Sequence, residues 1–256
     1  ISGHPYLSIP AAMLAGVLSG FVTAILQTKM GVNSLLAGII VNTALYSVNI
    51  AVMGNSSLLN MNRTETVFTV LRDALKETAF ADTYRLIIAA AAVLLVGLFL
   101  AFFLKTRLGL AIRATGNNPD MVRSSSINPT VTTIIGLCIA NSFTALSGCL
   151  LAQSQKSVNI DIGTGMVTVA LASLLIGSVF LGKRKIPLRI VGMVLGAFVF
   201  RLVYTVALRF HMPAFMLKFV SSVIVVIAIS LPYLKKQLPL AVRRLKKRFG
   251  RSSTNA

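Results

Sequence analysis

Seven stretches of this chain are apolar over a length that suits a helix crossing a lipid bilayer. The hydrocarbon core of a bilayer is about 30 Å thick, and about 20 mostly apolar helical residues span it. No stretch alternates apolar and polar residues, as the strands of a transmembrane barrel do. The stretches are 9–27, 35–53, 86–104, 131–151, 166–181, 190–208 and 215–234. The sequence therefore predicts an all-α fold: a polytopic helical membrane protein with about seven transmembrane spans in this chain.

Composition agrees with a chain surrounded by lipid. Of its 256 residues, 55% are hydrophobic and 12% are charged, whereas about a quarter of the residues in a soluble protein are charged. The fifth stretch, 166–181, is short and rich in small residues, so we expect a tilted, broken or partly re-entrant segment there. We expect residues 1–234 to form one transmembrane domain and residues 235–256 to form a basic tail.

The charges predict how the chain is oriented. The chain has 25 Lys and Arg against 6 Asp and Glu. If residues 105–128 are cytoplasmic and the spans alternate, 17 basic residues and one acid lie on the inner side. Seven basic residues and five acids then lie outside. The positive-inside rule therefore predicts a cytoplasmic C-terminus. Because seven spans would leave Ile1 outside, we also expect a further N-terminal span, about eight in all, that this chain lacks.

The basic excess does not indicate nucleic-acid binding, because the cations sit in short loops beside membrane spans. The tail at 235–256 places apolar residues at helical spacing among its cations. It would lie on the anionic inner leaflet of the bilayer, or it would contact a cytoplasmic partner.

Motifs for catalysis or for metal binding are missing from the sequence. Residues 177–184 read G-S-V-F-L-G-K-R and match seven positions of a phosphate-binding loop. Arg184 replaces the Ser or Thr that holds magnesium, and the match completes an apolar span instead of following a strand. We therefore expect no enzyme activity, no ATP site and no cofactor in this chain.

The segment between the third and fourth spans carries the most information. Residues 109–128 read GLAIRATGNNPDMVRSSSIN. They predict a short helix that stops at Gly116, a turn at Asn118, and a second short helix with Pro119 in its first turn. Such a compact projection suits a cleft on a partner, although it would equally be an ordinary inter-span loop.

This segment resembles the cytoplasmic loop of permease subunits of ATP-binding-cassette importers, in the branch of branched-chain amino acid and ribose permeases. The loop of that branch has the shape G-x-A-x-R-A-x-G-x-N-P-x-x-A-R-x-x-G-I. Val122 and Ser126 depart from it, at a small residue and at a glycine. The residues that match are Gly109, Ala111, Arg113, Ala114, Gly116, Asn118, Pro119, Arg123 and Ile127. Residues 35–54, 145–155 and 161–177 are similar to tryptophan/tyrosine-type permeases in particular, so the likeness extends from about residue 35 to residue 232.

The resemblance implies a permease that forms the solute pathway for amino acids or similar small solutes in a bacterial plasma (inner) membrane. Its partners would be two cytoplasmic ATPase subunits that hold ATP and magnesium, a second permease copy or a related permease, and an extracytoplasmic substrate-binding protein. The coupling loop at 105–128 would sit in an ATPase groove. The expected coupling residues are Leu110, Arg113, Ala114, Gly116, Asn118, Pro119, Met121 and Arg123.

The long outer loop at 55–83 contains a predicted amphipathic helix. Its apolar stripe consists of Val67, Val70, Leu71, Ala74 and Leu75. This helix would lie on the bilayer surface, and its charged face would also dock the substrate-binding protein. The charged residues are Arg72, Asp73, Lys76 and Glu77.

Polar residues inside spans are the candidates for the translocation path, because they usually face a bundle interior or a cavity. They form one stripe in the second span and one in the fourth: Asn42, Tyr46, Asn49, Asn141, Thr144 and Ser147. They would equally serve as hydrogen-bonding contacts between helices. Arg201, within the sixth span, would snorkel outward or meet a carboxylate substrate.

The alternative to an importer subunit is a self-sufficient secondary transporter or channel. Secondary carriers commonly place an acid or a histidine within a span for ion coupling. Here no Asp, Glu or His lies in the middle of a predicted span.

Overall fold

The computed structural model describes residues 5–62, 64–74, 83–163, 166–181 and 186–209, together with residues 219, 222, 223, 226 and 230. The chain divides into two compact units, residues 1–162 and residues 163–256. Most of the predicted seventh span and the whole basic tail lie outside the described residues.

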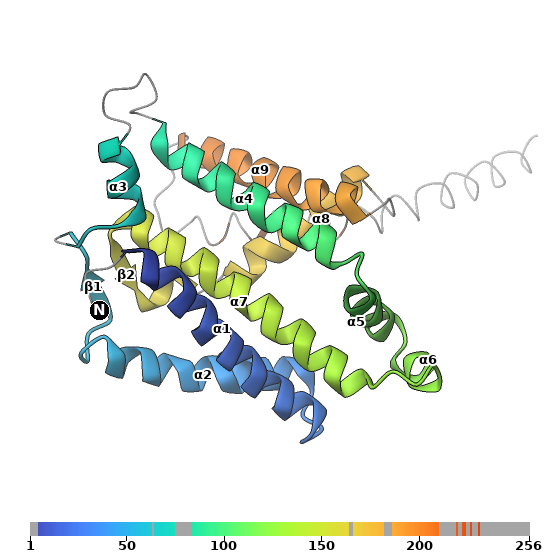
Figure 1. The fold of residues 1–256 in the computed structure, drawn as a ribbon. Coiled ribbons are helices and arrows are strands. Elements are labelled where there is room, and N and C mark those ends of the chain that lie inside the picture. The colour runs from blue at the N-terminus through green and yellow to red at the C-terminus, as the bar shows by residue number, and fades with distance from the viewer. Residues whose placement is uncertain are drawn as a thin grey trace, which may run out of the picture. The chain divides into compact units, whose positions relative to one another are not determined.

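Helices dominate the first unit (Figure 1). Its elements in chain order are α1 (Pro5–Thr28), α2 (Ser34–Val52), β1 (Leu58–Asn60), α3 (Val67–Ala74), α4 (Tyr84–Phe103), α5 (Arg107–Asn117), α6 (Pro119–Ser124), α7 (Pro129–Gln155) and β2 (Ser157–Asn159). A 3₁₀ turn, η1 (Ile160–Gly163), follows β2. The described helices of the second unit are α8 (Met166–Leu181) and α9 (Ile186–Arg209).

Five helices among the described residues are long and apolar enough to cross a membrane: Pro5–Thr28, Ser34–Val52, Tyr84–Phe103, Pro129–Gln155 and Ile186–Val206. They coincide with the first four predicted spans and the sixth, so the predicted class, a helical membrane protein, is confirmed. Helix α8 coincides with the fifth stretch. It has 16 residues, fewer than the other candidates, as its length in the sequence indicated.

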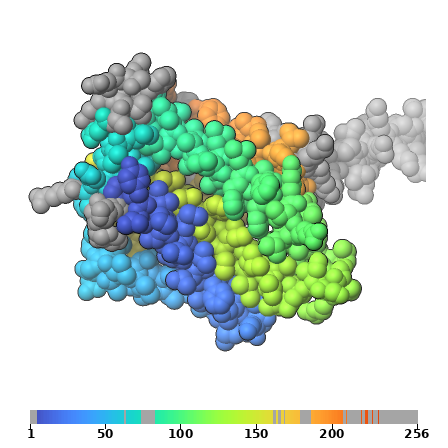
Figure 2. Space-filling model, in the orientation of Figure 1, coloured from blue at the N-terminus to red at the C-terminus, as the bar shows by residue number. Residues whose placement is uncertain are grey.

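Two glycines of α1 bring that helix against the backbone of α7. A methyl group at Gly16 would lie 2.5 Å from the carbonyl oxygen of Asn141, and one at Gly20 would lie 2.6 Å from that of Leu137. Glycines one turn apart allow this kind of close helix contact in a membrane. Figure 2 shows the dark blue surface of α1 lying directly against the yellow-green surface of α7.

The two described helices of the second unit pack in the same way. Gly177 of α8 faces the carbonyl of Gly192 in α9, and Gly196 faces the carbonyl of Ser173. Gly177 is the first glycine of the phosphate-loop match. It lies inside a helix, whereas a phosphate-binding loop needs that glycine between a strand and a helix.

Within the first unit, the short elements gather at the two ends of α7 (Figure 1). Strands β1 and β2 pair in antiparallel fashion, with Leu58 opposite Asn159, and α3 lies at the same end of α7. Helices α5 and α6 contact α7 at its other end.

Candidate functional site

The predicted coupling loop forms two short helices, α5 and α6. Helix α5 begins at a cap made by Thr106, whose hydroxyl accepts a hydrogen bond from the backbone N–H of Gly109 at 3.2 Å. Gly109 is buried against the end of α4, where a methyl group would collide with the carbonyl of Phe103 and lie 2.6 Å from Cα of Leu104. The sharp entry into the loop therefore requires glycine at this position.

One face of α5 is attached to α7. The hydroxyls of Thr115 and Thr132 lie 2.8 Å apart, and Thr132 is buried. Ile112 extends toward Gly136 of α7, where a methyl group would lie 3.3 Å from its Cγ2 atom. The opposite face carries Arg113, which is exposed. A movement of α5 would consequently be passed directly to the N-terminal end of α7.

Helix α6 starts at Asn118. Its side-chain oxygen accepts hydrogen bonds from the backbone N–H groups of Asp120 at 3.0 Å and Met121 at 3.1 Å. Pro119 occupies the first turn, as predicted, because proline lacks the N–H that would be unpaired there. Asn118 itself is extended, since the residue before a proline is disfavoured in helical conformation.

A Schellman motif closes α6. The N–H of Ile127 donates to the carbonyl of Val122, and the N–H of Ser126 donates to that of Arg123, both at 3.2 Å. Ser126 has a φ of +62°, in the left-handed region that favours glycine. This is the position at which the resembled loop has Gly. Val122, the other departure, is 1% exposed and therefore serves packing.

The prediction that the first helix stops at Gly116 was wrong. Helix α5 continues to Asn117, and Gly116 has helical geometry with open space around its Cα. The helix ends at Asn117, two residues before Pro119, because a helical conformation is disfavoured for Asn118, the residue before the proline. Gly116 is therefore an exposed position on the loop, and the backbone geometry does not require glycine there.

The loop presents apolar and basic side chains together. Leu110 is 52% exposed and Met121 is 59% exposed, and Arg113 and Arg123 are exposed among them. Gly116, Asn118 and Pro119 are exposed as well, and Ala114 is half-buried. The sequence reading missed Leu108, which is as exposed as Leu110. Its position at the start of an amphipathic helix was the signal for it.

The polar stripe of α2 points away from the other helices of the first unit. Asn42, Tyr46 and Asn49 are all exposed, whereas Ala37 and Val41 form the buried face. An uncovered amide in hydrocarbon is unfavourable, because lipid provides no hydrogen-bonding partner. This face of α2 therefore suits water, solute or another subunit better than lipid.

In the polar stripe of α7, by contrast, two of the three side chains form hydrogen bonds within their own helix. Asn141 and Thr144 each donate to a carbonyl of their own helix, those of Leu137 and Ala140, both at 3.0 Å. Thr144 and Ser147 are exposed and Asn141 is half-buried. The structure does not bring the two stripes together, since α1 lies between α2 and α7 (Figure 1).

Arg201 lies in α9 with an exposed side chain. Its guanidinium carbon is 5.9 Å from the ring centroid of Tyr204, one turn further along the helix. The side chain therefore extends toward the C-terminal end of α9, the direction that snorkelling requires.

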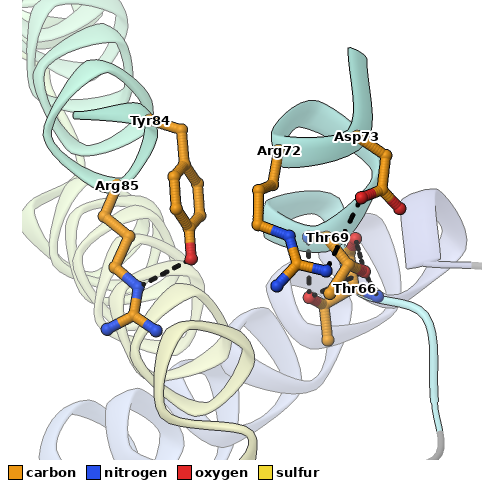
Figure 3. Close-up of polar contacts among 6 residues, drawn as sticks. All are labelled: Thr66, Thr69, Arg72, Asp73, Tyr84 and Arg85. Carbon is orange, nitrogen blue, oxygen red and sulfur yellow. Dashed lines mark hydrogen bonds and ion pairs between the residues drawn. The ribbon is translucent and has the colours of Figure 1, made fainter. Parts of the chain in front are cut away.

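Charged groups gather on α3 and at the start of α4 (Figure 3), at the end of the first unit opposite the coupling loop (Figure 1). On α3, Arg72 and Asp73 form an exposed ion pair at 3.5 Å. At the start of α4, the Nε–H of Arg85 donates to the Tyr84 hydroxyl at 3.0 Å. Lys76, Glu77 and Leu75 lie outside the described residues. Phe68 of α3 is buried, which the predicted apolar stripe did not include.

The sequence did not predict that a buried side-chain amide contacts the start of α3. Gln153 of α7 is 4% exposed. Its side-chain oxygen accepts from the N–H of Val67 at 3.0 Å, and its nitrogen donates to the hydroxyl of Ser8 at 2.8 Å. A glutamine near the end of an apolar span was the only sequence signal for it. Among the described residues, His, Cys, Asp and Glu form no group that would hold a metal ion.

The chain is similar to known permease components over most of its length. The profile of the family described as branched-chain amino acid transport system / permease component matches residues 2–229. A tyrosine transport system permease protein of Clostridioides difficile is 29% identical over 87% of this chain and 71% of its own length.

Two more distant relatives point the same way. A branched-chain amino acid transport permease protein of Methanocaldococcus jannaschii is 26% identical over 60% of the chain and 50% of its own length. A nucleoside ABC transporter permease protein of Lactococcus lactis is 25% identical over 64% of the chain and 49% of its own length. The chain thus spans about half of these two relatives. No solved structure matches it.

Proposed function

The chain belongs to the family of branched-chain amino acid transport permease components, and on that premise we propose how its surfaces act in transport. It is a multi-pass membrane protein and a permease subunit of the kind found in ATP-binding-cassette importers. The observation that carries the proposal is the α5–α6 loop, an exposed apolar and basic surface that is attached to a span through Thr115 and Thr132.

The loop at 105–128 is the coupling element. Leu110 and Met121 enter an apolar groove of an ATPase subunit, and Arg113 and Arg123 meet acidic groups at its rim. Nucleotide binding to the ATPases shifts the permease between two states because it changes the contacts of this loop. ATP and magnesium reside on the ATPases, and this chain holds no cofactor and performs no hydrolysis.

The solute path runs along the polar faces. Asn42, Tyr46 and Asn49 of α2 line it, with Thr144 and Ser147 of α7 and the half-buried Asn141 as further members. A second permease copy or a related permease completes the walls. The transported solute is an amino acid or a similar small molecule, which the named substrates of the tyrosine and branched-chain relatives support.

The opposite end of the first unit receives an extracytoplasmic substrate-binding protein. Arg72 and Asp73 of α3 are exposed there, and Lys76 and Glu77 follow them in the sequence. The protein lies in the bacterial inner membrane with its C-terminus in the cytoplasm, where the basic tail meets anionic lipid or the ATPase.

Replacing Arg113 by Glu tests the coupling surface. Arg113→Glu should weaken binding of the ATPase subunits by about tenfold or more, because a like charge then faces the acidic rim. Lys29→Glu is the matched control, since Lys29 is an exposed cation on the same side of the membrane in a different loop. Binding and ATP-driven uptake are measured in proteoliposomes that contain the permease and its ATPases.

Normal ATPase binding by Arg113→Glu would contradict the coupling assignment. Uptake by the permease alone, driven by an ion gradient without ATPases or ATP, would contradict the importer and support a self-sufficient transporter.

A further inference from the structure

Helix α7 contacts functional surfaces at both of its ends. It has 27 residues without interruption, which corresponds to about 40 Å at 1.5 Å per residue. The coupling helices α5 and α6 contact its N-terminal part, and the outer helix α3 contacts its C-terminal part.

The attachment of α3 to α7 is specific. The N–H of Val67 is one of the first backbone donors of α3, which have no partner within the helix. It donates to Gln153 of α7 at 3.0 Å. The N–H of Thr66 donates to the hydroxyl of Thr69 at 2.7 Å, and the N–H of Thr69 donates to the hydroxyl of Thr66 at 3.2 Å. Gln153 therefore supplies the hydrogen bond that comes from outside this segment.

The same amide reaches α1. Its nitrogen donates to the hydroxyl of Ser8 at 2.8 Å, and Gln153 is 4% exposed. An amide buried to this degree is unfavourable unless both its ends are bonded. Three elements far apart in sequence therefore share one side chain, and none of them can move away without breaking a buried hydrogen bond.

Helices α1 and α7 are in close backbone contact. Gly16 and Gly20 hold α1 against the backbone of α7, with no space for a side chain between them. At the inner end, the Thr115–Thr132 contact and the position of Ile112 beside Gly136 attach α5 to the same helix. A displacement of α5 is thus transmitted along α7 and not absorbed within it.

We propose that α7 is a rigid strut through which the coupling loop and the outer helix α3 move together, and that Gln153 is the positioning residue at its outer end. The inference rests on the proposed function, in which the ATPases act on α5–α6 and the substrate-binding protein docks at α3. Coupling between two sites is reciprocal, so ATP on one side of the membrane changes the state of α3 on the other.

The test uses hydrogen exchange of the backbone amides of residues 66–74. Gln153→Met keeps the length of the side chain and removes its hydrogen bonds to Val67 and Ser8, together with the 3.4 Å contact that its nitrogen makes with the sulfur of Cys149. Gln155→Met is the matched control, because Gln155 is exposed on the same helix two residues later. In the purified permease, Gln153→Met should speed exchange in α3 by about tenfold, the effect of one buried hydrogen bond. Gln155→Met should leave the exchange rate unchanged.

The second measurement uses the complex with the ATPase subunits in lipid nanodiscs, with and without MgATP. In the unaltered complex, MgATP should change the exchange rate of α3. This response should be lost in Gln153→Met, while MgATP binding is retained, and it should persist in Gln155→Met. Ser8→Ala removes the hydrogen bond between Ser8 and Gln153 and should shift both measurements in the same direction by a smaller factor. It also serves as the test variant if Gln153→Met does not fold.

The outcomes are distinct. Unchanged α3 exchange in both Gln153→Met and Ser8→Ala would overturn the role of Gln153. Faster α3 exchange with an intact MgATP response would overturn the strut and leave the proposed function standing. A permease that binds no ATPase subunits would overturn the proposed function itself.

Discussion

Backbone conformation at single residues explains the shape of the coupling loop. Gly109 is required because the loop turns against the carbonyl of Phe103, whereas Gly116, in the same short helix, has open space around it. Ser126 adopts a left-handed φ of +62° at the end of α6. A residue with a Cβ atom is strained in that region, and glycine is not.

Replacing Ser126 by Gly should stabilise the permease. Because the left-handed conformation carries an energetic penalty for serine, Ser126→Gly should raise the free energy of unfolding by about 1 kcal/mol. Thermal unfolding in detergent measures the change. Ser124→Gly, two residues earlier at the last helical position of α6, is the control and should lower stability, since glycine is less favourable than serine in helical conformation. A Ser126→Gly variant that unfolds at lower temperature would contradict the Schellman geometry.

Two helix pairs among the described residues, α1 with α7 and α8 with α9, pack through close backbone contact. The contact of α1 with α7 and that of α8 with α9 both use glycines opposite carbonyl groups. Lipid is as apolar as leucine, so a hydrophobic side chain gains little by leaving it for a helix interface. Close backbone approach gains van der Waals contact instead, and it makes α1 and α7 a rigid pair.

Gly16→Val should separate α1 from α7. Its Cβ atom would lie 2.5 Å from the carbonyl oxygen of Asn141 and 2.7 Å from Cβ of Ala145. Overpacking of this kind lowers stability by about 1–3 kcal/mol, which should appear as a lower melting temperature in detergent. Gly38→Val in α2 is the matched control, because nothing lies within 4 Å of its position. Equal melting temperatures for the two variants would show that α1 and α7 are not in close contact.

On the scale of the first unit, the two ends of α7 carry different chemistry. One end bears the α5–α6 loop with exposed Arg113 and Arg123, and the other bears α3 and the β1–β2 pair. The distribution of charge along the sequence orients these ends, since 17 of 25 cations fall on one side when the spans alternate. The ends are therefore expected to face opposite sides of the membrane.

Substituted cysteines test this orientation. In a background with Cys138→Ala and Cys149→Ala, Leu110→Cys should react with a membrane-impermeant maleimide in inverted vesicles and in permeabilised cells. It should not react in intact cells. A cysteine at Arg72 should react in intact spheroplasts. Both native positions are exposed in the structure, so in a permease expressed without its partners access to the reagent depends on the membrane alone. The reverse labelling pattern would contradict the predicted topology.

Much of the fold was predictable because a membrane simplifies the physics. A run of apolar residues long enough to span the bilayer has to be helical, since every backbone polar group needs a partner within its own segment. The predicted spans at 9–27, 35–53, 86–104 and 131–151 accordingly coincide with α1, α2, α4 and α7. Turn chemistry likewise located the start of α6 at Pro119. The stop at Gly116 was wrong because the constraint before Pro119 outweighs the weak helix propensity of glycine.

By itself, the sequence determined the membrane class, five of the predicted spans and the resemblance of the loop to importer permeases, because these depend on local composition and spacing. Only the tertiary structure decided which residues touch across the chain. Gln153 is an ordinary glutamine in sequence, and its role emerges when Val67 and Ser8, 86 and 145 residues away, meet it. Contacts of this range arise from the packing of whole helices, which hydropathy and short motifs do not encode.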